Sequence, residues 1–180
     1  MAELYGVTNK ILAEITSHIL KHPDLCKFLY YTDNKYQYEN LLEEEPVPAS
    51  KIIDKKLFVY RRVPEVIEEV GAFMYIDLYR LTPTVLGGNV KEVSFAIDIL
   101  VHYNCLKTSV GNRAVCIEEA LESALSDYHK KSSLGKITLV RMQPILGLVD
   151  DYTGYTITFT TNEIRMNKDI LNNDTNKKRK

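Results

Sequence analysis

The stretch KEVSFAIDILVHYN, residues 91–104, carries the strongest structural signal in the chain. Its apolar side chains alternate with a mixed set, which is typical of a β-strand. One face holds Val93, Phe95, Ile97, Ile99, Val101 and Tyr103, and the other holds Ser94, Ala96, Asp98, Leu100 and His102. Because strands of about 5–6 residues are usual, this one either extends beyond the domain body or packs both faces. We therefore expect a partner on the mixed face, at Asp98.

A second long strand precedes this one and forms a hairpin with it. Residues 72–81 alternate in the same way and place Tyr75 and Tyr79 on the face opposite Met74. The residues LGGN, 86–89, suit a tight turn, since glycine and asparagine tolerate positive φ. Tyrosine is enriched at interfaces because its ring buries a large area. We expect this hairpin to reach past the domain body and to contribute Tyr75, Tyr79 and Asp98 to an interface.

The closing stretch VDDYTGYTITFTTNEI, residues 149–164, predicts a strand with two different faces. Tyr155, Ile157 and Phe159 share one face, and Thr156, Thr158 and Thr160 share the other. The threonine face is either hydrated or in contact with another subunit. Residues 136–148 predict the preceding strand, where Pro144 indicates a bulge or an edge position. Residues 57–61 carry a further, shorter strand signal.

Two main helices accompany these strands. Residues 3–21 carry Leu4, Val7, Ile11, Ile15 and Ile19 on one stripe, and Ala114, Ile117, Leu121, Leu125 and Tyr128 form the stripe of the second helix. His22-Pro23 should end the first helix, and Pro23 should open a short extra one. Asn112 is the expected N-cap of the second main helix. The predicted fold is α+β, an antiparallel or mixed sheet of about four to five strands with both main helices on one face.

The chain divides into one domain, residues 1–164, and a basic flexible C-terminal tail, residues 165–180. Within the domain, residues 32–56 lack a period and contain PVPAS, so we expect a long loop that is either a contact arm or a mobile insertion. The tail is expected either to contact DNA or an acidic neighbour through its basic groups or to be a solubilising end. Ile170 and Leu171 are its expected anchors.

Cysteine usage and hydropathy indicate the cellular compartment in which we expect the protein to be made. Three cysteines without a CxxC pair favour a reducing environment. The opening residues lack the pattern of a secretion signal, and no apolar run approaches the roughly 18–20 residues that span a bilayer. We expect synthesis in the cytoplasm and no membrane contact.

Motifs for catalysis or cofactor binding are missing from the sequence. The phosphate loop, the dinucleotide turn, the HExxH helix and the GxSxG elbow do not occur. His18 and His22 have a spacing that would suit a metal, but no ligand motif accompanies them. Asp150 and Asp151 resemble turn formers more than a carboxylate pair. We expect no catalytic residue, cofactor or metal, and an enzyme with an unrecognised site is the alternative.

A family resemblance rests on the order of these segments. A helix, the hairpin with VKEVSFAIDILVHYNC, the acidic-faced helix NRAVCIEEALESALSDYH and the closing hairpin LGLVDDYTGYTITFTTNEI follow one another. This order resembles the phage tail-terminator and head-to-tail joining proteins, whose last strand likewise follows an aspartate-glycine turn and alternates aromatic and polar residues. The resemblance covers residues 2–164. The long 32–56 segment and the basic tail depart from the family pattern.

The resemblance implies a structural protein of the virion. Members of that family form rings in the neck or tail, are not enzymes, and join portal-side or connector proteins to tail proteins. The threonine face and the long hairpin would then serve neighbouring subunits of a homo-oligomeric ring. The two departures leave a tail terminator and a neck adaptor both open. The alternative function is a small regulatory or nucleic-acid-binding domain whose tail contacts phosphates.

Overall fold

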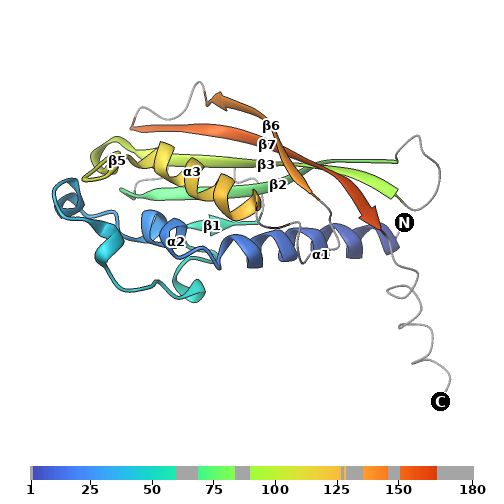
Figure 1. Cartoon of the computed structure of the whole chain (residues 1–180), viewed down its shortest axis with the longest axis horizontal. Helices are drawn as coiled ribbons and strands as arrows, with labels where there is room; N and C mark the ends of the chain where they lie inside the picture. The colour runs from blue at the N-terminus through green and yellow to red at the C-terminus, as the bar shows by residue number, and fades with distance from the viewer. Residues whose placement is uncertain are drawn as a thin grey trace, which may run out of the picture.

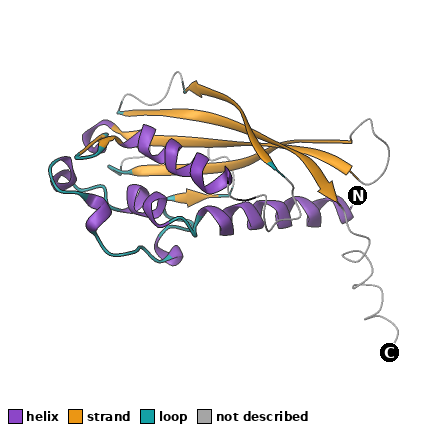
Figure 2. Cartoon of the chain, in the orientation of Figure 1, coloured by secondary structure: helices purple, strands orange, loops and turns teal. Residues whose placement is uncertain are grey.

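The structure, a computed structural model, describes residues 2–59, 69–83, 90–126, 128, 136–145 and 151–165. Three α-helices occur in these ranges: α1 Ala2–Ile19, α2 Pro23–Tyr30 and α3 Arg113–Ser126. The main strands are β1 Leu57–Phe58, β2 Ala72–Pro83, β3 Val90–His102, β6 Ile137–Pro144 and β7 Tyr152–Arg165. A small second sheet pairs β4 Lys107–Thr108 with β5 Gly111–Asn112. The predicted α+β class is confirmed (Figure 2).

The main sheet is mixed and has the strand order β1-β2-β3-β7-β6 (Figure 1). β1 runs parallel to β2, and all other neighbours are antiparallel. The long strand signal of the sequence becomes β3, the central strand, where Ile97 lies opposite Ile76 of β2 and Ile157 of β7. β6 is an edge strand that ends at Pro144, as the proline indicated.

Both main helices pack on one face of this sheet. Ile11, Ile15 and Ile19 of α1 are buried in the same core as the inward residues of β2, β3 and β7. The predicted stripe of α3 is buried in full, namely Ala114, Ile117, Leu121, Leu125 and Tyr128. Figure 1 shows α3 in front of the strands, and α1 with α2 along the β1 side. The side chains of Leu4 and Val7 lie outside the described residues.

The starts of α2 and α3 follow the predicted signals at Pro23 and Asn112. His22 is the N-cap of α2, where its Nδ1 accepts a hydrogen bond from the Leu25 amide at 3.4 Å, and Pro23 opens the helix. Asn112 caps α3, because its Oδ1 accepts from the Ala114 amide at 2.9 Å. These local signals placed the helices correctly.

The segment of residues 32–56 is packed against the body of the domain. It forms three short 3₁₀-helices, η1 Asn34–Gln37, η2 Leu41–Glu43 and η3 Ala49–Lys51. Four of its apolar side chains enter the main core, Tyr36, Leu41, Val47 and Ile52. Of the two alternatives for this segment, a contact arm or a mobile insertion, the mobile insertion does not fit this packing. These apolar residues are spaced irregularly because each one fills a separate gap, so no period marked them in the sequence.

Two further boundaries differ from the predictions. Tyr103 was expected on the inward face of the long strand, but it begins the 3₁₀-helix η4 Tyr103–Cys105 and is exposed. Strand β7 begins at Tyr152, so Gly154 belongs to the strand and not to the preceding turn. The predicted turn at 86–89 and the tail from residue 166 onward lie outside the described residues.

Gly154 lies where β7 approaches β3 too closely for a side chain. A Cβ at this position would overlap the carbonyl oxygen of Ile99 and lie 2.9 Å from its carbonyl carbon. Overpacking against a fixed backbone typically costs about 1–3 kcal/mol. We expect Gly154→Ala to lower the free energy of unfolding by about 3 kcal/mol, measured as a lower urea midpoint.

The matched control for this substitution is Thr153→Ala, which removes atoms from the neighbouring, half-buried position. It should shift the urea midpoint much less than Gly154→Ala. Equal urea midpoints for Gly154→Ala and the unmodified protein would show that β7 and β3 can move apart at this position without a loss of stability.

Candidate functional site

The row of threonines on β7 lies on the sheet face opposite the main core. Ile157 and Phe159 point into that core, so the alternating Thr156, Thr158 and Thr160 point the other way, and all three are half-buried. Thr156 donates a hydrogen bond through Oγ1 to Oδ1 of Asp98 on β3 at 2.6 Å. The structure therefore brings together four of the residues predicted for an interface.

Cross-strand pairing extends this row into a polar surface, which we call the outer polar face. One register row joins Asp98, Thr156 and Gln143, and the next joins Asp77, Ala96, Thr158 and Arg141. Ser94, Thr160 and Thr138 follow in a third row. The strands hold neighbouring groups about 5 Å apart. The described side chains of this face therefore form a fixed array of hydroxyls, carboxylates, an amide and the guanidinium of Arg141.

Among the described side chains of this face, the charges are arranged asymmetrically. Asp77 and Asp98 lie on the two strands nearest the centre and the β1 side of the sheet, while Arg141 lies exposed on the edge strand β6. Rigid polar arrays of this kind set the register and orientation of a contact more than its strength. The outer polar face therefore suits a directional contact with a complementary protein surface.

Tyr75 does not belong to the outer polar face, although it lies on the same side of the sheet. It is 4% exposed and packs in a second hydrophobic cluster with its ring stacked on Phe58 at 5.1 Å. The other members of that cluster are Phe73, Leu100 and Tyr152. Tyr75 is thus part of an intrachain core, and its prediction as an interface residue is corrected by this burial.

Polar groups close the second cluster on one side. Lys56 lies with its Nζ 4.5 Å from the ring centroid of Phe73 and 2.8 Å from Oε1 of Glu69. The hydroxyl of Tyr152 donates to the carbonyl oxygen of Glu69, and burial raises the pKa of Tyr152 to about 12. The chain itself therefore covers one end of the sheet's outer side, and the polar end is the part open to a partner.

The remaining predicted contact residues lie beyond the described side chains. Tyr79 is part of β2, but its side chain is outside the described residues, as are Ile170 and Leu171. The structure supports no statement on their contacts.

The residues considered for chemistry have structural partners. The Nε2 of His18 lies 2.8 Å from the carbonyl oxygen of Ala124, and the His18 ring packs against Tyr128 at 4.6 Å. His22 caps α2. Burial raises the thiol pKa of Cys26, Cys105 and Cys116. Within the described ranges, no group of three or more metal-ligating side chains comes together.

One internal polar residue escaped the sequence analysis. Arg113, the first residue of α3, is 0% exposed, and its Nε and Nη1 donate to the carbonyl oxygens of Cys105 at 2.6 Å and Phe28 at 2.7 Å. Burial lowers the pKa of this guanidinium. The sequence does place Arg113 directly after the cap residue Asn112, at the start of α3. The carbonyl oxygens that its guanidinium contacts are set only by the fold.

Comparison with known proteins and protein families assigns the chain to a family. No curated protein matches the chain. No helix in the described part of the chain is long and apolar enough to span a bilayer. The family model YomW matches residues 22–161, which include α2, α3 and most of the main sheet. Since this match covers more than half of the chain, the protein belongs to the YomW family, a phage-like family of the Bacillus SPbeta region.

Proposed function

We propose that the protein is a structural component of a phage virion that forms a ring in the neck or tail. In this role it acts as a tail terminator or a head-to-tail connector and joins portal-side to tail-side components. Membership in a phage-related family supports the viral setting. The single observation that carries the interface is the outer polar face, where Thr156 donates a hydrogen bond to Asp98 and the half-buried Thr158 and Thr160 follow along β7.

The shape of the sheet suits a ring contact. β2, β3 and β7 are long, and Figure 1 shows them extending beyond α3 along the molecule's long axis. A ring needs two different complementary patches on each subunit, because repeated head-to-tail contacts close only in that way. The outer polar face is one such patch, and its charge asymmetry gives each contact a direction.

The mass of the protein in solution and negative-stain images test this proposal. A closed ring should show a mass several times that of one chain and annular particles. A monomer that binds duplex DNA with a strong salt dependence would instead favour the regulatory or nucleic-acid-binding function. That outcome would contradict the proposed ring.

Thr158→Arg tests the assigned interface within the ring. Thr158 lies in the middle of the outer polar face, so a long charged side chain there should block a closely packed partner. We expect assembly to weaken by about tenfold or more, as is usual for residues central to an interface. Sedimentation over a range of protein concentrations measures the change, and the thermal midpoint should stay close to that of the unmodified chain.

Ser123→Arg is the matched control, because Ser123 is exposed on α3, on the other side of the sheet. It should leave assembly unchanged. If the Thr158→Arg variant assembled into rings as the unmodified chain does, the outer polar face would not be part of the interface. The proposal of a ring itself would still stand.

A further inference from the structure

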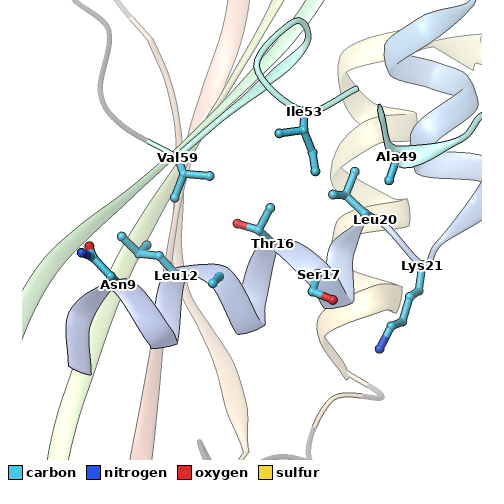
Figure 3. A pocket seen from close by; sticks show the side chains of 10 residues that line it. Asn9, Leu12, Thr16, Ser17, Leu20, Lys21, Ala49, Ile53 and Val59 are labelled. Carbon is cyan, nitrogen blue, oxygen red and sulfur yellow. The ribbon is translucent and has the colours of Figure 1, made fainter. Parts of the chain in front are cut away.

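A second surface, distinct from the outer polar face, lies along α1. It is a groove of about 660 Å³ between α1 and the segment that contains η3 and the residues around β1. Figure 3 shows Leu12, Thr16 and Leu20 on the helix side, with Ile53 and Val59 across from them. Ile53 is 39% exposed, and Leu12, Leu20 and Val59 are half-buried. The groove therefore leaves several aliphatic side chains in partial contact with water.

Thr16 gives this groove an unsatisfied polar group. The residue is 6% exposed, and its Oγ1 is buried without a hydrogen-bond partner. Buried hydroxyls in native proteins are nearly always paired, so an unpaired one calls for a specific explanation. An occupant that combines apolar side chains with a hydrogen-bonding group would complete both features of the groove.

The chain carries a segment with these properties. Residues 166–180 follow Arg165, and they combine Met166, Ile170 and Leu171 with several asparagines. In an extended chain successive side chains point to opposite sides, so the neighbours Ile170 and Leu171 would face opposite walls of the groove. An asparagine side chain or a main-chain carbonyl is able to accept the hydrogen bond of Thr16.

The segment starts within reach of the groove. Figure 1 shows the end of β7 and the N-terminal end of α1 at the same end of the molecule's long axis. The groove runs along α1 from Asn9 to Lys21. Leu171 is six residues beyond Arg165, so it reaches up to about 20 Å from it in an extended chain. At about 1.5 Å per helical residue, Leu12 lies about 15 Å along α1 from Ala2 and is within that reach, whereas the far end of the groove at Leu20 is about 27 Å away and beyond it.

We propose that the C-terminal segment of the chain docks in the near end of the groove of its own α1, with Ile170 and Leu171 against Leu12 and Val59. The contact buries the exposed aliphatic side chains of both partners, which is favourable in proportion to the apolar area removed from water. The basic end beyond residue 176 then stays free for an anionic partner. The docking occurs within a single subunit and does not rest on the proposed ring.

Tryptophan fluorescence tests this contact, because the chain has no tryptophan of its own. Leu171→Trp in the full chain should emit at shorter wavelength and resist acrylamide quenching, since its indole is buried. Thr175→Trp is the control and should emit as a solvated indole. Emission from Leu171→Trp that equals that of Thr175→Trp would overturn the proposal.

A substitution in the groove tests the site of docking. Ser17 is exposed and lines the groove, so Ser17→Arg should block the occupant without disturbing the fold. Combined with Leu171→Trp, it should return the emission to that of a solvated indole, whereas Ser123→Arg on α3 should not. A buried emission that survives Ser17→Arg would place the segment elsewhere and overturn the proposal.

Dilution separates the chain's own segment from that of another copy. A contact within one subunit keeps its emission at every protein concentration, and loss of the shift on dilution would assign the groove to a neighbouring copy. As a second measurement, Ile170→Asp with Leu171→Asp should shift the methyl resonances of Leu12 and Val59 in an NMR spectrum. Unmoved resonances would contradict docking. None of these outcomes depends on whether rings form.

Discussion

Leu121→Asp should abolish folding of this protein, and Ile15→Asp should do the same. Both side chains are 0% exposed and lie in the core between the helices and the sheet. Burying a carboxylate without a partner costs several kcal/mol, which is comparable with a total stability of about 5–15 kcal/mol. Circular dichroism and a thermal melt measure the loss, which should appear as a missing cooperative transition at neutral pH.

Exposed positions on the same helices provide the controls. Ser123→Asp on α3 and Ala13→Asp on α1 introduce the same charge at exposed positions, where substitutions usually change stability by no more than about 0.5 kcal/mol. They should melt close to the unmodified chain. Wild-type melts for both buried variants would show that the two helices do not share a core with the sheet.

Arg113→Leu should lower the free energy of unfolding by about 3–5 kcal/mol. The substitution leaves the carbonyl oxygens of Phe28 and Cys105 buried without donors, at about 1–3 kcal/mol each. It also removes the cost of burying a cation, which acts in the opposite direction. We expect the lost hydrogen bonds to outweigh that gain, because both are short and the smaller leucine leaves a cavity.

Arg113→Lys separates charge from geometry at the same position. Lysine keeps the charge, but its single ammonium group lacks the planar fork with which arginine reaches two carbonyls. Its loss of stability should therefore be substantial, although smaller than that of Arg113→Leu. Urea unfolding measures both variants.

Lys55→Leu, at an exposed position just before β1, is the control for removal of a surface cation. Its stability should stay within about 0.5 kcal/mol of the unmodified chain. If Arg113→Leu behaved in the same way, the link that Arg113 makes between α2, η4 and α3 would contribute nothing to stability.

The proposed neck or tail ring and the docked C-terminal segment involve different surfaces. The outer polar face lies on the side of the sheet away from the helices, while the groove lies along α1. Thr158→Arg and Ser17→Arg therefore act independently. A chain in which both substitutions have their expected effects would show that assembly and tail docking are separate properties.

Much of the fold was predictable from local patterns. Period-two alternation identified β2, β3 and β7 and the faces of their side chains, and helical stripes identified α1 and α3. Pro23 placed the start of α2, and the N-cap Asn112 placed the start of α3. These signals are readable because burial on one side of a regular element repeats with the period of that element. The threonine row and its position opposite the core follow from the same alternation.

Other features were decided only by contacts between distant parts of the chain. Arg113 is buried because Phe28 and Cys105 present carbonyl oxygens to it, and Phe28 is 85 residues away in the sequence. Tyr75 lies in an internal cluster because Phe58 covers its ring, and Gly154 is required because Ile99 approaches it from β3. Apolar residues of the 32–56 segment fill gaps in the core without any repeat. A local pattern records which side of an element is buried, whereas what covers that side depends on tertiary packing, which joins residues that no sequence window contains.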